Sequence, residues 1–164
     1  MKQECLNYNY VYNADYPVER LVNKIAESKL YLFNLFLIES QIKTQRGESK
    51  RPYGVGLLVS GYDASGPRLF RTCPSANSYE YNCVAIGARC QSANTFLENK
   101  LEELENASPQ QLIKWAIEAM KKAQDLEITP YNVAISVVGK DQEYKILSTE
   151  EVDTYVKGNQ MEIV

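Results

Sequence analysis

The sequence predicts an α+β fold in which sheets are stacked between layers of helices. Two observations lead to this class. Arg51–Asp63 contains an entry turn, an apolar strand and an exit turn in one short segment. Along the chain, helical and strand patterns then alternate in the order helix, hairpin, strand, two helices, hairpin, helix. With 164 residues the chain is long enough for a real core, so we expect residues 1–164 to form a single domain.

The first hairpin is predicted from the strand in Arg51–Asp63 and its partner Arg68–Thr72. Gly54 and Gly56 are expected to let another backbone approach closely. The turn between the strands has a mechanism, because aspartate bonds its own backbone and glycine tolerates positive φ. A continuous apolar run, typical of a strand buried on both faces, comprises Val55, Leu57, Leu58 and Val59.

Helical periodicity predicts helices on either side of this hairpin. Pro17 opens the first pattern, since proline is acceptable in a first turn, whereas Lys2–Tyr12 before it is ambiguous. A second helix, Gln91–Asn106, follows a short strand, Asn82–Ala88, that ends in a glycine turn. The apolar faces are expected to comprise Val18, Leu21, Val22 and Ile25 in the first helix, and Ala93, Phe96, Leu97, Leu101 and Leu104 in the second.

Two capping boxes mark the helices of the second half. Ser108 and Gln111 flank Pro109 at the start of one helix, and Ser148 with Glu151 starts the last. Between them a strand over Asn132–Val138 turns at Gly139-Lys140-Asp141 and pairs with Glu143–Leu147. The residues expected to point inward from the helix after Ser108 are Leu112, Ile113, Ala116, Ile117 and Met120.

Composition and charge exclude several classes of site and partner. The chain has 18 basic and 21 acidic residues without blocks, so it carries no basic footprint for nucleic acid. It has no histidine, and the cysteines lack metal-type spacing, which removes the usual zinc sites and His-based triads. The start of the chain shows no secretory leader pattern. We therefore expect reduced thiols in a cytosolic protein.

Several reactive side chains have a structural interpretation beside the functional one. Ser75 and Ser92 have no histidine to activate them, so loop and helix-start roles are favoured. Cys73 and Cys90 are candidates for redox sensitivity, although packing is the commoner role of a free cysteine. The sequon Asn106-Ala107-Ser108 is better interpreted as a helix junction. A tyrosine cluster suits either an intersubunit surface or local packing, and it comprises Tyr8, Tyr10, Tyr12 and Tyr16.

Long ordered motifs resemble the α-ring subunits of the 20S proteasome, and within that family the alpha type-1 branch. The likeness spans nearly the whole chain apart from one segment. The motifs that carry it are Arg51–Asp63, Gly66-Pro67, Thr72–Asn77, Ala85–Arg89 with Gln91-Ser92-Ala93, Met1–Leu6 and Asn132–Asp141.

This resemblance implies the αββα sandwich of the N-terminal-nucleophile hydrolases, used without its chemistry. The implied role is a structural subunit of the outer ring, which gates substrate entry and docks regulators in ubiquitin-dependent degradation. We accordingly expect no catalytic, cofactor-binding or metal-binding residue and no cofactor. Expected partners are other α subunits, β-ring subunits and the regulatory particle, and neither nucleic acid nor a membrane is an expected partner. The expected location is the cytoplasm and nucleus. The alternatives are a hydrolase whose processing frees Cys5, for which the start at Met1 gives no support, or a non-functional truncated product.

The sequence departs from the family pattern in two places. Met1 matches a position inside the first long helix of the family, so the fold is expected to be incomplete at the N-terminus. An uncovered apolar sheet face would then make the isolated chain insoluble or only partly structured. The second departure is an extra segment, Ser28–Glu39, whose apolar centre is too short to span a bilayer. One interpretation extends the helix from Pro17, and another makes the segment a hydrophobic patch for a partner. The interpretation that fits the flanks best is an intron read through in the gene prediction, because Glu27-Ser28 and Glu39-Ser40 repeat at the two ends and deleting Ser28–Glu39 restores a family-like sequence.

Overall fold

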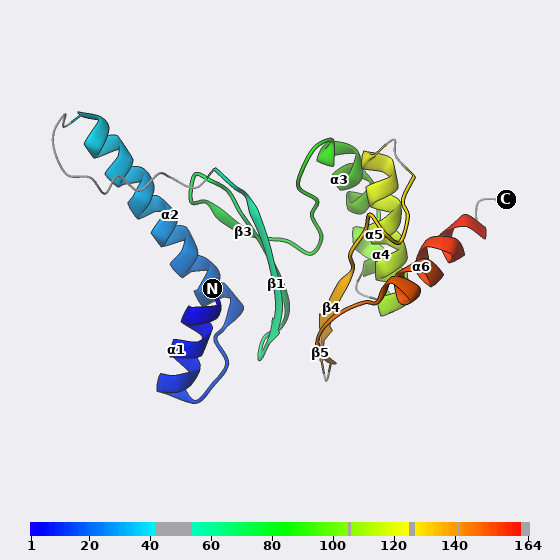
Figure 1. The fold of residues 1–164 in the computed structure, drawn as a ribbon, viewed down its shortest axis with the longest axis horizontal. Helices are drawn as coiled ribbons and strands as arrows, with labels where there is room; N and C mark the ends of the chain where they lie inside the picture. The colour runs from blue at the N-terminus through cyan, green and yellow to red at the C-terminus, as the bar shows by residue number, and fades with distance from the viewer. Residues whose placement is uncertain (42–53, 105, 125–126, 141, 162–164) are drawn as a thin grey trace. The chain divides into compact units, whose positions relative to one another are not determined.

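The computed structural model describes residues 1–41, 54–104, 106–124, 127–140 and 142–161 (Figure 1). They form two compact units, Met1–Tyr81 and Asn82–Val164. Each unit combines helices with antiparallel strands, which confirms the α+β class. The linker Gly47–Lys50 and the first three residues of Arg51–Asp63 lie outside the described residues.

The first unit is a three-stranded sheet with a long helix on one face. Its helices are α1 (Lys2–Tyr12) and α2 (Val18–Gln41), so the ambiguous N-terminal segment is helical. The strands pair antiparallel in the order β1-β2-β3, and α2 contacts all three (Figure 1). Their bounds are β1 Leu57–Asp63, β2 Gly66–Thr72 and β3 Ser78–Glu80.

The predicted hairpin forms with the turn chemistry that its sequence indicates. β1 and β2 pair from Leu57 opposite Thr72 to Asp63 opposite Gly66. Asp63 Oδ1 accepts a hydrogen bond from the Ser65 backbone N–H at 2.8 Å, and Gly66 has φ +109°. Both features were expected of this turn, because the short carboxylate reaches the backbone two residues on and glycine has no Cβ to clash.

Burial of β1 on both faces is wrong. Exposure alternates along the strand, and Leu58 and Tyr62 point away from α2 with 40% and 39% of their surface accessible. The opposite face is covered by α2, where Phe70 and Thr72 are buried. The continuous apolar run thus encodes two apolar faces, and within the first unit a helix covers only one of them.

The long helix α2 follows the apolar periodicity that begins after Pro17. Leu21, Val22 and Ala26 are buried on its sheet-facing side. The helix continues through Ser28–Glu39 to Gln41, which confirms the interpretation of that segment as a helical extension. Its interpretations as a partner surface and as a read-through intron stay untested.

The second unit packs helices around a small core and carries a hairpin. Both predicted capping boxes form: Ser108 with Gln111, and Ser148 with Glu151. The core is formed by Ile117, Ile128, Val152 and Val156. The elements are α3 (Cys90–Glu98), α4 (Leu101–Leu104), α5 (Pro109–Ala123), β4 (Ser136–Gly139), β5 (Gln142–Ile146) and α6 (Thr149–Met161).

Asn82–Ala88 is not a strand. The Asn94 side chain occupies both backbone hydrogen-bonding groups of Ala85, accepting from its N–H at 2.7 Å and donating to its carbonyl at 3.2 Å. A strand needs a neighbouring strand for those groups, and here an amide side chain takes that place. The later strand also begins at Ser136 rather than Asn132, because Asn132 belongs to a turn.

The helix predicted over Gln91–Asn106 is divided into α3 and α4. Lys100 N donates to Leu97 O at 3.0 Å, a tight i to i−3 bond that ends the α-helical ladder. Some residues predicted to point inward are exposed instead. Leu101 in α4 and Leu112 in α5 are 40% and 41% exposed, and Ala116 in α5 is also exposed. Ile117 and Ala93 are buried as expected, and so is Ala119, which was not expected.

Candidate functional site

The reactive side chains singled out in the sequence lie in ordinary structural positions. Ser75 is exposed in the turn between β2 and β3, and Ser92 is exposed in the first turn of α3. Cys5 lies in α1, where its backbone N–H donates to Met1 O at 3.0 Å. The sequon residue Ser108 caps α5, so the interpretation of that motif as a helix junction is confirmed.

The cysteines are unpaired and partly buried. Cys73 follows β2, and Cys90 opens α3. Burial raises the pKa of the Cys83 thiol, and the Glu98 carboxylate raises it further. Its Sγ donates to Leu97 O at 3.8 Å, so Cys83 stays protonated, unlike a reactive thiolate.

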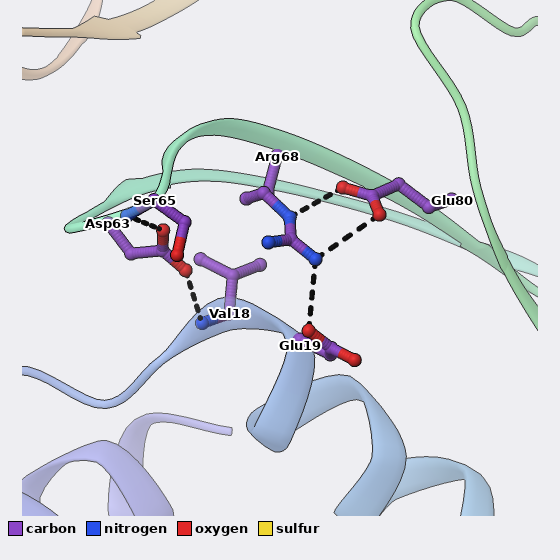
Figure 2. A network of polar contacts seen from close by, with 6 residues as sticks. All are labelled: Val18, Glu19, Asp63, Ser65, Arg68 and Glu80. Atoms are coloured by element: carbon purple, nitrogen blue, oxygen red, sulfur yellow. Dashed lines mark hydrogen bonds and ion pairs between the residues drawn. The ribbon is translucent and has the colours of Figure 1, made fainter.

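The start of α2 is attached to the tip of the first hairpin by Asp63. While Oδ1 closes the turn, Oδ2 accepts from the Val18 backbone N–H at 3.3 Å (Figure 2). Asp63 therefore satisfies one of the free donors of the helix N-terminus from a distant part of the sequence. Gly61 permits this approach, because a Cβ there would lie 2.7 Å from Val18 Cγ2.

A second attachment is an arginine held between two carboxylates (Figure 2). Arg68 Nη2 lies 3.0 Å from Glu19 Oε2 on α2, and Nε lies 2.5 Å from Glu80 Oε1 on β3. Burial opposes the charged form, but Glu80 and Glu19 together raise the pKa of the guanidinium. The network joins the helix to two strands of the sheet.

The third attachment is a buried lysine. Lys29, with 2% of its surface accessible, donates to Thr72 Oγ1 at 3.0 Å, Val55 O at 3.3 Å and Cys73 O at 3.4 Å. All three acceptors are neutral, and burial lowers the pKa of the ammonium, an effect that Cys73 opposes. Sequence reasoning missed this residue, although its spacing from Val22 and Ala26 places it on the buried face of α2.

The tyrosine cluster resolves into packing and surface residues. The Tyr8 ring packs at a tilt against Tyr12 and Tyr16, with ring centroids 4.5 and 4.4 Å away, and the Arg20 guanidinium lies over the Tyr8 ring. Local packing between α1 and the start of α2 therefore explains three of the four residues. Tyr10 is separate, with 91% of its surface accessible.

The arrangement holds no metal centre and no membrane-spanning helix among the described residues. Within those residues, histidine, cysteine, aspartate and glutamate form no group of three that suits a metal ion. None of the described helices combines the length and hydropathy that crossing a bilayer requires. What the described part of the chain offers is a helix fixed to one face of a sheet by Asp63, Arg68 and Lys29.

Comparison with known proteins identifies the class of this mixed helix and sheet chain. The family model described as Proteasome subunit matches residues 1–138. Proteasome subunit alpha type-1 of Dictyostelium discoideum is 41% identical over 159 residues, which cover 95% of this chain and 59% of the relative. Proteasome subunit alpha type-1 of Drosophila melanogaster is 35% identical, with coverage of 95% and 53%. The probable proteasome subunit alpha type-6 of Schizosaccharomyces pombe is 38% identical, with coverage of 95% and 54%.

The chain belongs to the proteasome subunit family. It spans 53% to 59% of the length of these three relatives. The family resemblance carried by Arg51–Asp63 and the other motifs is thereby confirmed, and the matched relatives are named as α-type subunits.

Proposed function

We propose that this chain acts as a non-catalytic structural α subunit of the 20S proteasome core. The similarity to named α-type subunits along 95% of the chain carries the proposal. A structural role is consistent with the attachment of a helix to a sheet by Asp63, Arg68 and Lys29. Its role would be to help form the outer ring, which gates substrate entry and docks regulators in ubiquitin-dependent degradation.

The finer architecture proposed is the αββα sandwich of the N-terminal-nucleophile hydrolases. In its support, the sheet of the first unit has α2 on one face and exposed Leu58 and Tyr62 on the other. An apolar sheet face of this kind calls for a second sheet against it. The single-domain organisation of residues 1–164 remains part of this proposal.

The partners proposed are the other α subunits, β-ring subunits and, through the ring, the regulatory particle, in cytoplasm and nucleus. In this proposal the helices and strands would supply contacts within the ring rather than catalytic groups. The hydrolase alternative would need Cys5 as a new N-terminus. In the structure the Cys5 amide is hydrogen-bonded inside α1, and no observation favours its release.

Co-purification tests this function. A tagged chain expressed in cells that assemble proteasomes should copurify with the other α and β subunits in a particle of the 20S class. N-terminal sequencing of the incorporated chain should not begin at Cys5. Recovery of the chain only as a free or aggregated species would overturn the scaffold role and favour the non-functional product. Peptide mass spectrometry on native particles, purified without the tagged chain, decides whether Ser28–Glu39 is translated, since a peptide crossing Leu30 to Ile38 excludes a read-through intron.

A further inference from the structure

The first helix, α1, belongs to the first unit without burying a side chain in it. All 11 residues of α1 are described by the structure, and none of them is buried. Glu4, Cys5 and Tyr8 are half-buried, whereas Leu6 and Tyr10 are 71% and 91% exposed. The next helix, α2, by contrast buries its sheet-facing side. The apolar burial that holds α2 on the sheet is therefore largely missing from α1.

Surface contacts hold α1 beside the start of α2 (Figure 1). The Tyr8 ring lies against Tyr16, with ring centroids 4.4 Å apart, and Arg20 Cζ lies 5.8 Å from the centroid of the Tyr8 ring. Glu4 forms an ion pair with Lys24, and this hydrogen bond raises the pKa of the Lys24 ammonium. Both charged side chains are at least 36% exposed. Exposed pairs of this kind are weak in water, and salt screens them further.

The link between the two helices gives α1 an end of its own. Asn13 has φ +48°, in the left-handed region, and its backbone N–H donates to Asn9 O at 2.7 Å. Asparagine tolerates this C-cap conformation, so the hydrogen-bond ladder of α1 stops before α2 begins. The attachments of α2 to the sheet join Val18 to Asp63 and Lys29 to β2. These attachments lie between α2 and the strands and do not require α1.

We propose that α1 is a conformational switch, which detaches from α2 and unfolds while α2 and the sheet stay folded. An isolated helix shorter than about 12 to 15 residues is marginal in water, so α1 loses its helical structure once its contacts break. Detachment releases Tyr16, Arg20 and Lys24 from their partners on α1 and leaves an aromatic and cationic surface at the start of α2. Ionic strength shifts the balance between the docked and detached states. The switch belongs to the chain itself and does not depend on its incorporation into a particle.

The thiol of Cys5, on α1, reports whether the helix is docked. The full chain, at low concentration, is treated with iodoacetamide, and mass spectrometry measures the alkylation rate of each cysteine relative to its rate in the denatured chain. We expect the relative rate of Cys5 to rise about two- to fivefold between about 0.05 M and about 1 M sodium chloride, as for the loss of one exposed ion pair. Cys73, which follows β2, is the internal control, and its relative rate should stay unchanged.

A substitution of Tyr8 tests the aromatic contacts. Tyr8→Ala removes the contacts with Tyr16 and Arg20, so the relative rate of Cys5 at low salt should rise by at least about fivefold. Tyr10→Ala is the matched control, because it removes an exposed ring from the same helix. It should change the rate by about twofold or less.

Three outcomes overturn the switch. A relative rate of Cys5 that is insensitive to salt or to Tyr8→Ala means that these contacts do not control docking. A rate equal to that of the denatured chain at low salt means that α1 is not docked at all. Equal acceleration of Cys5 and Cys73 in Tyr8→Ala means that the whole unit opens instead of α1 alone.

Discussion

Lys29 Nζ donates a hydrogen bond to Thr72 Oγ1 at 3.0 Å, and this pair joins the middle of α2 to the end of β2. The residues are 43 positions apart in the sequence. Val55 O and Cys73 O complete the surroundings of the ammonium, so the charge is solvated by neutral oxygens of the protein instead of water. The helix is thereby held on the sheet by a polar contact within an otherwise apolar layer.

Removing this side chain should loosen the helix from the sheet. Lys29→Ala leaves buried carbonyl acceptors without their donor, and we expect the free energy of unfolding of the first unit to fall by about 2 kcal/mol. Hydrogen exchange of the β1 and β2 amides measures it. Lys24→Ala is the matched control, because Lys24 is an exposed lysine on the same helix, paired with Glu4, and its loss should change exchange less. Equal effects of the two changes would contradict the structural role of Lys29.

The same residue predicts a pH dependence. Burial lowers the pKa of Lys29 in the folded state from its ordinary value of 10.5. At pH values between the lowered pKa of the folded state and about 10.5, the unfolded chain binds more protons than the folded chain. The free energy of unfolding should therefore rise with pH across this interval. This component should be absent in Lys29→Met, which keeps the length of the side chain but cannot titrate. The measurement is the difference in unfolding midpoint between the wild-type chain and Lys29→Met at a series of alkaline pH values. A difference that does not grow with pH contradicts the prediction.

The close approach of α2 to the hairpin predicts a size limit at Gly61. In Gly61→Ala the new methyl group would lie 2.7 Å from Val18 Cγ2, and overpacking should cost about 1 to 3 kcal/mol of stability. Val18→Ala in the same chain should recover part of this loss by removing the clashing atom. Gly54→Ala is the control, since a Cβ at that residue would meet no other atom within 4 Å. Chemical denaturation of Gly61→Ala, Val18→Ala, the double variant and Gly54→Ala measures these effects, and additive losses from Gly61→Ala and Val18→Ala would refute the clash.

Backbone strain in the turn after β2 predicts a stabilising change. Ala76 has φ +69°, where its Cβ is unfavourable, so Ala76→Gly should raise the free energy of unfolding by less than about 1 kcal/mol. Ala64→Gly, in the β1 to β2 turn and without a positive φ, should instead lower it. Thermal unfolding gives the sign for each, and a loss of stability in Ala76→Gly would be inconsistent with strain at this position.

The outer face of the first sheet predicts the behaviour of the isolated chain. Leu58 and Tyr62 are exposed on the same face of β1, so the chain expressed alone should aggregate. Leu58→Lys with Tyr62→Lys should increase the soluble fraction several-fold, while the same pair of changes should reduce incorporation into particles. Sedimentation and light scattering measure the first effect. A soluble wild-type monomer with a sharp cooperative melt would refute the aggregation.

The sequence by itself determined the parts of this protein that depend on neighbouring residues. Ser108 with Gln111 and Ser148 with Glu151 form the expected capping boxes, because each interaction spans three positions and needs no other element. The Asp63 turn was predictable for the same reason. The ordered motifs determined the family, since their similarity does not require a resolved structure.

Only the tertiary structure decided which faces are covered and which polar groups find partners. Asn82–Ala88 has the composition of a strand, but the Asn94 side chain, on α3, forms the hydrogen bonds to the Ala85 backbone that a neighbouring strand would otherwise form. The burial of Lys29 depends on acceptors 26 to 44 positions away, and no local pattern specifies them. Gly61 likewise acquires its role from Val18 across the packed layer. Long-range packing sets these features because burial and hydrogen bonding are properties of a complete environment, to which sequence neighbours contribute only part.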